Sequence, residues 1–252
     1  MNKLILQPEY PGLGDHLFYS HIPRIAIETG VYDRVFISRQ AQFRHPDICK
    51  LVWEMNPYIS GFVDEPGEAP PVAPPSNKEE NLLDQMMFSF GLDDGRRWHE
   101  PEIYYEPNVI PEYANFSLYD PNFITNAGSL INGKRVASFF EKNKIRIDIH
   151  MKSLSNRSVC LPRYDDKNAL STSLFQFVNT LFSCSSIYCL ATGTATLCSA
   201  LNKNATVFYS KEIKEMFLHS KNNRYILLEP TCVDKYVNKL KKKIDRLVEL
   251  LK

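Results

Sequence analysis

The sequence predicts an α/β protein built of two successive units, each a parallel β-sheet with helices. Short apolar runs of strand length alternate with segments of helical spacing over residues 3–65 and again over residues 115–209. In each series a buried strand runs through a glycine-containing turn into a helix. The chain has 252 residues, 44% of them apolar, which suffices to bury the core of one large domain or two modest ones.

The first unit is expected at residues 1–112 and begins in the order strand, helix, strand, helix, strand. Pro23 lies inside the first helix and must kink or restart it, because proline removes a backbone hydrogen bond. Pro46 suits the first turn of the second helix. The strands are predicted at 3–7, 34–38 and 58–65, and the helices at 15–29 and 45–56.

A proline-rich segment at residues 66–76 interrupts this unit. Its prolines exclude a helix or a central strand and favour an extended surface loop. We interpret it as an insertion within the first domain, because the part before it is short for an independent domain. A helix at 81–92 and a strand at 101–107 are predicted to complete the domain.

The second unit is expected at residues 113–230. Its most regular part, residues 174–209, predicts helix, strand, turn, helix and strand in succession. The predicted strands are 115–122, 158–165, 187–190 and 206–209, and the predicted helices are 133–144, 174–181 and 197–201.

Residues 231–252 predict an amphipathic helix with one apolar stripe and a basic opposite face, with seven Lys or Arg against three acids from Pro230 onward. Such a face is either a solvated surface or a site of peripheral contact with an anionic membrane. Both interpretations stay open at this point.

Composition excludes several classes of protein. A formal net charge of +1 does not favour nucleic acid as a partner, which calls for a concentrated basic surface. No apolar run approaches the roughly 20 residues of a membrane span, and the amino-terminal residues do not resemble a secretory signal. The six cysteines form no C-x-x-C pair, which is typical of buried free thiols in a reducing compartment. We therefore expect a cytoplasmic protein.

The stretch "CLATGTATL" carries the first candidate site, after the predicted strand 187–190. The carboxyl end of a parallel strand and the start of the next helix together favour an anion, because free amides and the helix dipole meet there. Gly193 allows close backbone approach, and the hydroxyls of Thr192, Thr194 and Thr196 can bind phosphate oxygens or simply cap the helix.

The stretch "PGLGDHL" carries the second candidate site. Gly12 and Gly14 match the start of a dinucleotide fingerprint, but Leu17 replaces its third glycine. Asp15 is either a helix cap or a general base that faces a ligand across a cleft. The spacing of the histidines matches no metal motif, and the chain has no D-x-D pair, so no metal or cofactor is predicted.

These motifs resemble the heptosyltransferase-like glycosyltransferases of family 9. Gly14-Asp15 and Pro23 occur in the same order as the family's first loop and helix, and Thr192-Gly193 followed by Ser199-Ala200-Leu201 is similar to its later loop. Ala191 and Thr196 depart from the pattern, standing where the family has an acid and a histidine. The resemblance implies a GT-B-like fold: two Rossmann-like β/α/β domains with a cleft between them.

The resemblance also implies a reaction, the inverting and metal-independent transfer of a sugar from a nucleoside diphosphate to a growing cell-surface glycan such as lipopolysaccharide or capsule. Asp15 would be the general base. A bacterial cytoplasmic enzyme is expected, either free or at the inner face of the cytoplasmic membrane. A sugar-nucleotide hydrolase or epimerase of the same fold, or a non-catalytic nucleotide-sugar-binding module, stays an alternative. The predicted catalytic residues are Asp15 and His16, and the predicted donor or phosphate ligands are Gly12, Gly14, Arg163, Thr192, Gly193, Thr194, Thr196 and Lys211.

Overall fold

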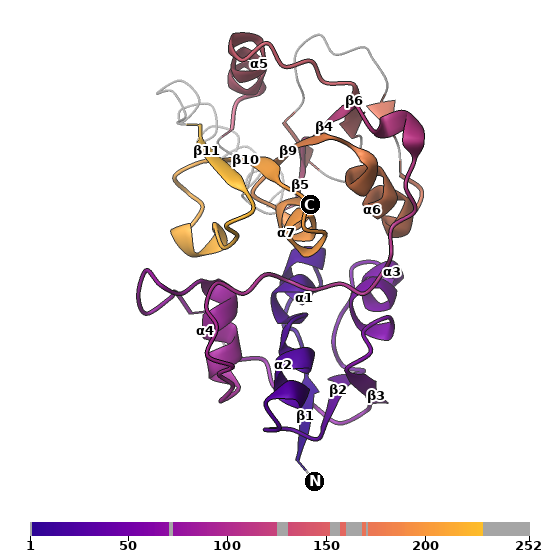
Figure 1. Cartoon of the computed structure of the whole chain (residues 1–252), viewed down its shortest axis with the longest axis vertical. Coiled ribbons are helices and arrows are strands. Elements are labelled where there is room, and N and C mark those ends of the chain that lie inside the picture. Colours follow the sequence, from indigo (N-terminus) through magenta and orange to yellow (C-terminus); the bar gives the residue numbers. More distant parts are fainter. Residues whose placement is uncertain are drawn as a thin grey trace, which may run out of the picture.

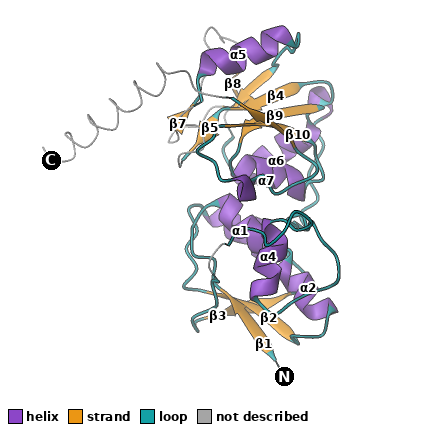
Figure 2. Ribbon diagram, turned by 90° about the vertical axis from the view of Figure 1, so that its left-hand side faces the viewer, coloured by secondary structure: helices purple, strands orange, loops and turns teal. Residues whose placement is uncertain are grey.

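A computed structural model shows two parallel β-sheets at opposite ends of an elongated molecule, with helices packed between them (Figures 1 and 2). It describes residues 2–70, 73–124, 131–151, 157–159, 168–169 and 171–228. The extended segment after the helix α4 (Leu82–Ser89) crosses the waist between the two halves (Figure 1). The mixed α/β architecture with parallel sheets confirms the predicted fold class.

The first half holds a parallel three-stranded sheet in the order β1-β2-β3. Pro23 explains why the predicted first helix is two helices, since α2 begins again with this proline in its first turn. A π-helix, η1 (Lys50–Glu54), continues α3. The elements are β1 (Lys3–Leu6), α1 (Leu13–Tyr19), α2 (Ile22–Glu28), β2 (Arg34–Ser38), α3 (Pro46–Cys49), β3 (Ile59–Val63) and α4 (Leu82–Ser89).

The second half holds a parallel six-stranded sheet in the order β11-β10-β9-β4-β6-β8. A short antiparallel pair, β5 (Asn122–Phe123) with β7 (Arg157–Ser158), lies beside it. The remaining elements are η2 (Pro111–Tyr113), β4 (Ser117–Asp120), α5 (Gly133–Lys142), β6 (Ile149–Met151), β8 (Asn168–Ala169), α6 (Leu174–Ser183), β9 (Ser186–Leu190), α7 (Gly193–Ala200), β10 (Ala205–Tyr209), η4 (Glu215–Phe217) and β11 (Arg224–Leu227).

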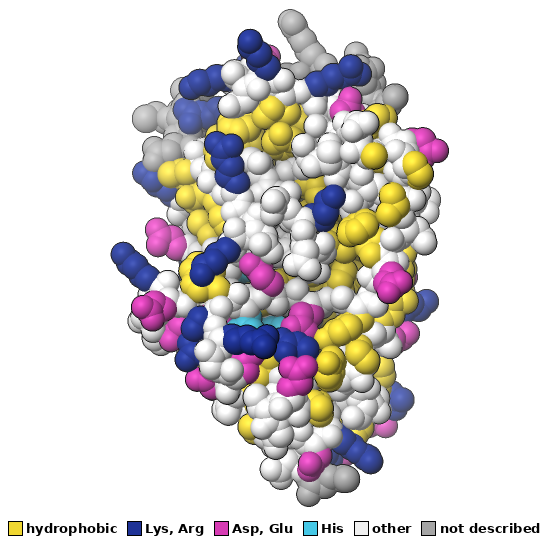
Figure 3. Space-filling view, in the orientation of Figure 1, with side chains coloured by type: hydrophobic (Ala, Val, Ile, Leu, Met, Phe, Trp, Pro, Cys, Tyr) yellow, Lys and Arg dark blue, Asp and Glu magenta, His cyan; other side chains and the backbone are white. Residues whose placement is uncertain are grey.

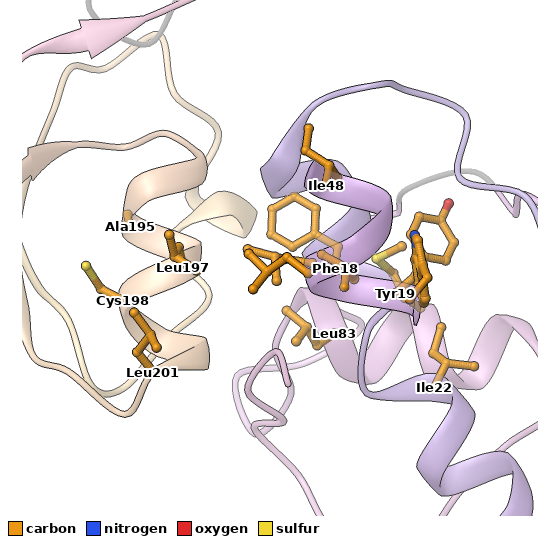
Figure 4. Close-up of a cluster of buried hydrophobic side chains, with 14 of the residues drawn as sticks. Phe18, Tyr19, Ile22, Ile48, Leu83, Ala195, Leu197, Cys198 and Leu201 are labelled. Carbon is orange, nitrogen blue, oxygen red and sulfur yellow. The ribbon is translucent and has the colours of Figure 1, made fainter. Parts of the chain in front are cut away.

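One hydrophobic core runs through the waist and joins the two halves. It includes Leu4 and Leu6 of β1 together with Ile187 of β9 and Leu197 of α7, all of them buried. Figure 4 shows the place where the side chains of α7 approach Phe18 and its neighbours. A second cluster, which includes Tyr119, Phe140 and Phe208, packs α5 onto the sheet. The two halves therefore share apolar packing, and the domain boundaries 1–112 and 113–230 stay a prediction.

Several sequence expectations need correction or lie outside the described residues. The strand predicted at 101–107 is wrong: these residues form an extended segment without sheet partners, because they cross between the halves. Within the proline-rich segment 66–76, the backbone of Glu68 pairs with β1. The predicted helix at 231–252 and most of the predicted strand at 158–165 lie outside the described residues.

The surface and the helices bear on two of the composition-based expectations. On the face in Figure 3, acidic and basic side chains are interspersed. Among the residues that the structure describes, no helix is long and apolar enough to span a bilayer.

Candidate functional site

The first glycine turn folds the Asp15 carboxylate back over the start of α1. Gly12 is the N-cap residue, and the Asp15 carboxylate accepts a hydrogen bond from its backbone amide. A methyl group in place of the Gly12 hydrogen would lie only 2.5 Å from Asp15 Oδ2, so glycine is needed for this fold-back. Asp15 is thus the third residue of the helix, in its acidic first turn, and not the N-cap itself.

Asp15 keeps part of its surface exposed, which a proton acceptor needs. Partial burial raises the pKa of its carboxyl. The Gly12 amide and the nearby positive charge of Arg44 act in the opposite direction and favour the ionised form. A carboxylate with a raised pKa and an open face is chemically suited to accept a proton.

His16 is a correction to the predicted catalytic pair. Its side chain is completely buried, with Nδ1 accepting from Trp53 Nε1 at 2.9 Å and Nε2 donating to the Gln42 carbonyl at 3.0 Å. Burial lowers its pKa to about 4, so the ring is neutral near pH 7. Because both ring nitrogens are occupied inside the core, His16 has a structural role.

In the second glycine turn, the polar side chains that follow the glycine are buried instead of partly exposed. Thr192 is the N-cap of α7, and its hydroxyl accepts from the Thr194 amide at 3.4 Å. Thr194 and Thr196 are buried. The Thr194 hydroxyl donates to Asp120 Oδ2 at 2.6 Å, and the Thr196 hydroxyl lies 3.3 Å from His219 Nε2. We therefore correct the prediction that these two hydroxyls face a phosphate, and leave Thr192 and Gly193 as the partly exposed part of the turn.

Asp120 and His219 were missed by the sequence analysis. Asp120 ends β4, and its second oxygen accepts from the backbone and side-chain amides of Asn122. Burial raises the pKa of Asp120 and lowers that of His219 to about 4. Asp120 lies near the carboxyl end of the predicted strand 115–122, which is the one signal that could have indicated it. His219 lies in an irregular segment without such a signal.

The two turns meet at their glycines. A methyl group added to Gly193 would lie 3.0 Å from Gly14 N, and one added to Gly14 would lie 3.2 Å from Gly193 Cα. The amino-terminal ends of α1 and α7 therefore cross in direct contact, closer at this point than the open cleft predicted between the halves (Figures 1 and 2). Gly14 thus serves close helix packing, and Asp15 follows it immediately.

Of the predicted cations, Lys211 is exposed two residues beyond β10, at the same sheet edge as Thr192, because β9 and β10 are parallel. Arg163 lies outside the described residues. The structure adds Arg44, whose Nη1 lies 3.5 Å from the position of a methyl group on Gly12. Arg44 follows β2, whose carboxyl end adjoins that of β1.

Two surface hollows lie elsewhere. One of about 470 Å³ is lined by residues at the amino ends of β9, β10 and β11. The other, of about 430 Å³, lies between Arg24, the segment 99–104 and the end of α7. Neither takes a lining residue from the two glycine turns. Within the described ranges, no group of three His, Cys, Asp or Glu residues is placed to hold a metal ion.

Comparison by sequence finds no matching family model and no matching curated protein. Comparison by structure finds TibC, an iron-containing dodecameric heptosyltransferase crystallised with ADP-D-β-D-heptose, at a TM-score of 0.60 and 15% identity. The alignment covers 88% of this chain but 61% of TibC, so the chain spans about three fifths of that protein. The fold is that of the heptosyltransferases.

Two further structures support the heptosyltransferase fold, and their alignments cover most of their own length. E. coli ADP-heptose LPS heptosyltransferase II aligns at a TM-score of 0.58 and 11% identity, over 97% of this chain and 100% of that one. A family 9 glycosyltransferase from Veillonella parvula aligns at a TM-score of 0.56 and 10% identity, over 96% and 88%. The likeness is therefore one of architecture.

Proposed function

We propose that this chain is a glycosyltransferase that moves a sugar from a nucleoside-diphosphate donor to an acceptor hydroxyl. One observation carries the proposal: the Asp15 carboxylate follows the glycine at which the two halves of a heptosyltransferase fold touch. A partly exposed carboxylate beside the start of α7, where helix amides favour an anion, supports the proposal.

The proposed chemistry is a single inverting displacement. Asp15 accepts the proton of the attacking hydroxyl while that oxygen forms a bond to the anomeric carbon. The bond from this carbon to the phosphate oxygen breaks, and its electron pair leaves with the nucleoside diphosphate. Asp15 then releases the proton to water. Metal-independent transfer is part of the proposal, and the absence of a D-x-D pair in the sequence supports it.

We place the donor phosphates at the exposed part of the second turn, Thr192 and Gly193, with Lys211 as a candidate cation. Thr194 and Thr196 would hold the helix from below through Asp120 and His219. The binding of ADP-heptose by TibC supports a nucleotide-sugar donor.

We further propose a bacterial cytoplasmic location and an acceptor that is a growing surface glycan. The name of the E. coli relative, an LPS heptosyltransferase, supports this acceptor class.

The test is transfer from radiolabelled ADP-, UDP- and GDP-sugars with and without acceptor extracts. Asp15→Asn keeps an oxygen for the Gly12 amide but cannot act as a base. We expect transfer to fall about 10²- to 10⁴-fold, the usual contribution of a general base. Because the pKa of Asp15 is raised, wild-type kcat/KM should begin to fall on acidification above the ordinary aspartate range.

Asp64→Asn is the matched control, since Asp64 is an exposed carboxylate whose ion pair with Arg39 is also exposed. Wild-type transfer rates in Asp15→Asn would refute the general-base role. Release of free sugar without an acceptor would indicate the hydrolase instead. Stabilisation by nucleoside diphosphates beyond that by NAD, without any turnover, would indicate a binding module.

A further inference from the structure

Arg44 lies beside Asp15 on a loop that hydrogen bonds and ring stacking hold in place. Its backbone amide donates to the Pro11 carbonyl at 2.9 Å, which joins the loop after β2 to the first glycine turn. Two residues earlier, the Gln42 carbonyl accepts from His16, and the ring of Phe43 stacks on His16 at 4.6 Å. His16 in turn accepts from Trp53 in the core. The loop that carries Arg44 is therefore fastened to α1 at the residue next to Asp15.

The side chain of Arg44 is exposed and offers unused donors. The Arg44 guanidinium and the Asp15 carboxylate both lie within 3.5 Å of one point, the position of a methyl group on Gly12. An ion pair requires a nitrogen and an oxygen within 4.0 Å of each other. No Arg44 nitrogen lies that close to an Asp15 oxygen. Within the part of the chain that the structure describes, no hydrogen bond or ion pair is made by this side chain. A guanidinium has five donors in a planar fork that matches phosphate and carboxylate oxygens.

We propose that Arg44 binds an oxyanion of the substrate, a phosphate or a carboxylate, next to Asp15. The proposal rests on the proposed transferase function and adds a binding residue to it. Two sources can supply this chemistry: the diphosphate of the donor and an acidic group on the acceptor. His16 is then a positioning residue, because it fixes the loop that carries Arg44 through Gln42 and Phe43.

Binding measurements separate the two sources without requiring turnover. The probes are UDP and inorganic pyrophosphate for the donor, and methyl β-D-glucuronide against the neutral methyl β-D-glucoside for the acceptor, titrated by calorimetry. In Arg44→Gln we expect one class of anion to bind about 10- to 100-fold more weakly, as when a hydrogen bond to a charged group is lost. Binding of the glucoside should not change. The class that weakens identifies the source.

Three variants make the result specific. Arg44→Lys keeps the charge but loses the fork, and should bind the anion with intermediate affinity. Arg39→Gln removes an exposed arginine paired with Asp64 and should bind as the wild type does. Asp15→Asn removes a neighbouring negative charge and should bind the anion at least as tightly as the wild type, although transfer falls.

Wild-type affinity for both anion classes in a folded Arg44→Gln protein would overturn the proposal, as would failure of the wild type to bind either class. Melting temperatures establish that each variant is folded. These outcomes are distinct from failure of the proposed function, which would appear as unchanged transfer in Asp15→Asn or as no transfer by the wild type while anion binding still depends on Arg44.

Discussion

The two glycine turns at the waist begin alike and end differently. Each follows a buried parallel strand, and each starts a helix. A buried histidine with a pKa lowered to about 4 lies at each helix: His16 within α1, and His219 beside Thr196 of α7. In the first turn the carboxylate of Asp15 stays partly exposed. In the second, the hydroxyls of Thr194 and Thr196 turn inward.

The difference arises from the groups that contact each turn. Asp120 takes the Thr194 hydroxyl because β4 lies next to β9 in the sheet and ends beneath α7. Asp15 has no such buried donor from another strand, and its partner is the Gly12 amide of its own turn. In the proposed reaction, proton transfer is therefore assigned to the first turn, and the second turn supplies the start of α7, where Thr194 and Thr196 contact Asp120 and His219.

The largest expected effect tests what the two turns share. A neutral buried histidine with a lowered pKa costs stability as the pH falls below the unfolded value near 6.5, because only the unfolded chain takes up the proton. Between pH 6.5 and about 4, His16 and His219 should each remove about 3 kcal/mol from the free energy of unfolding. Urea unfolding over this pH range measures the slope.

His16→Asn and His219→Asn should each lower that slope by about one proton. The comparison uses the slope because each variant also loses a buried contact and some absolute stability. His45→Asn, at an exposed histidine, is the control. If His16→Asn and His219→Asn both keep the wild-type slope of unfolding free energy against pH, the two turns do not share a neutral buried histidine of lowered pKa.

The next effect tests the contact between the turns. Gly193→Ala puts a methyl group 3.0 Å from Gly14 N, which is backbone and can yield only if α1 shifts against α7. We expect a loss of about 2 kcal/mol in the free energy of unfolding, as for overpacked core sites. Ser138→Ala, at an exposed position in α5, controls for the helix propensity of alanine. Unchanged stability in Gly193→Ala would mean that α1 and α7 pack less closely than the contact between Gly14 and Gly193 indicates.

The smallest effect separates the two threonine roles within the second turn. Thr194→Val leaves Asp120 Oδ2 without its donor and should cost at least about 1 kcal/mol. Thr192→Val removes the N-cap and should cost about the same. Their pH dependence differs. Loss of the donor raises the already raised pKa of Asp120 further, so the cost of Thr194→Val should grow as the pH rises from 3 to 7.

The cost of Thr192→Val should stay constant over the same range, because no ionisable partner is involved. Urea unfolding of both variants at pH 3, 5 and 7 gives the comparison. Equal pH profiles would contradict the placement of the Thr194 hydroxyl on a carboxylate.

The elements were largely predictable because their signals are local. Short apolar runs indicated β1 and β2, Pro23 indicated a kink or restart of the first helix, and Pro46 indicated the first turn of α3. The segment 101–107 misled the prediction, because its apolar and aromatic residues pack across the waist instead of along a sheet. Tyr105, for example, hydrogen-bonds Asn179 of α6 at 2.9 Å. A propensity for strand does not provide a strand partner.

The sequence by itself determined that glycine and a carboxylate stand at the end of the first strand, and that threonines stand at the start of α7, because chain order and helix start signals are local. Only the tertiary structure decided that Gly14 touches Gly193, that Asp120 holds Thr194 from 74 positions away, and that Arg44 stands beside Asp15. Burial and charge depend on which strands lie side by side, and a spacing rule along the chain carries no such information.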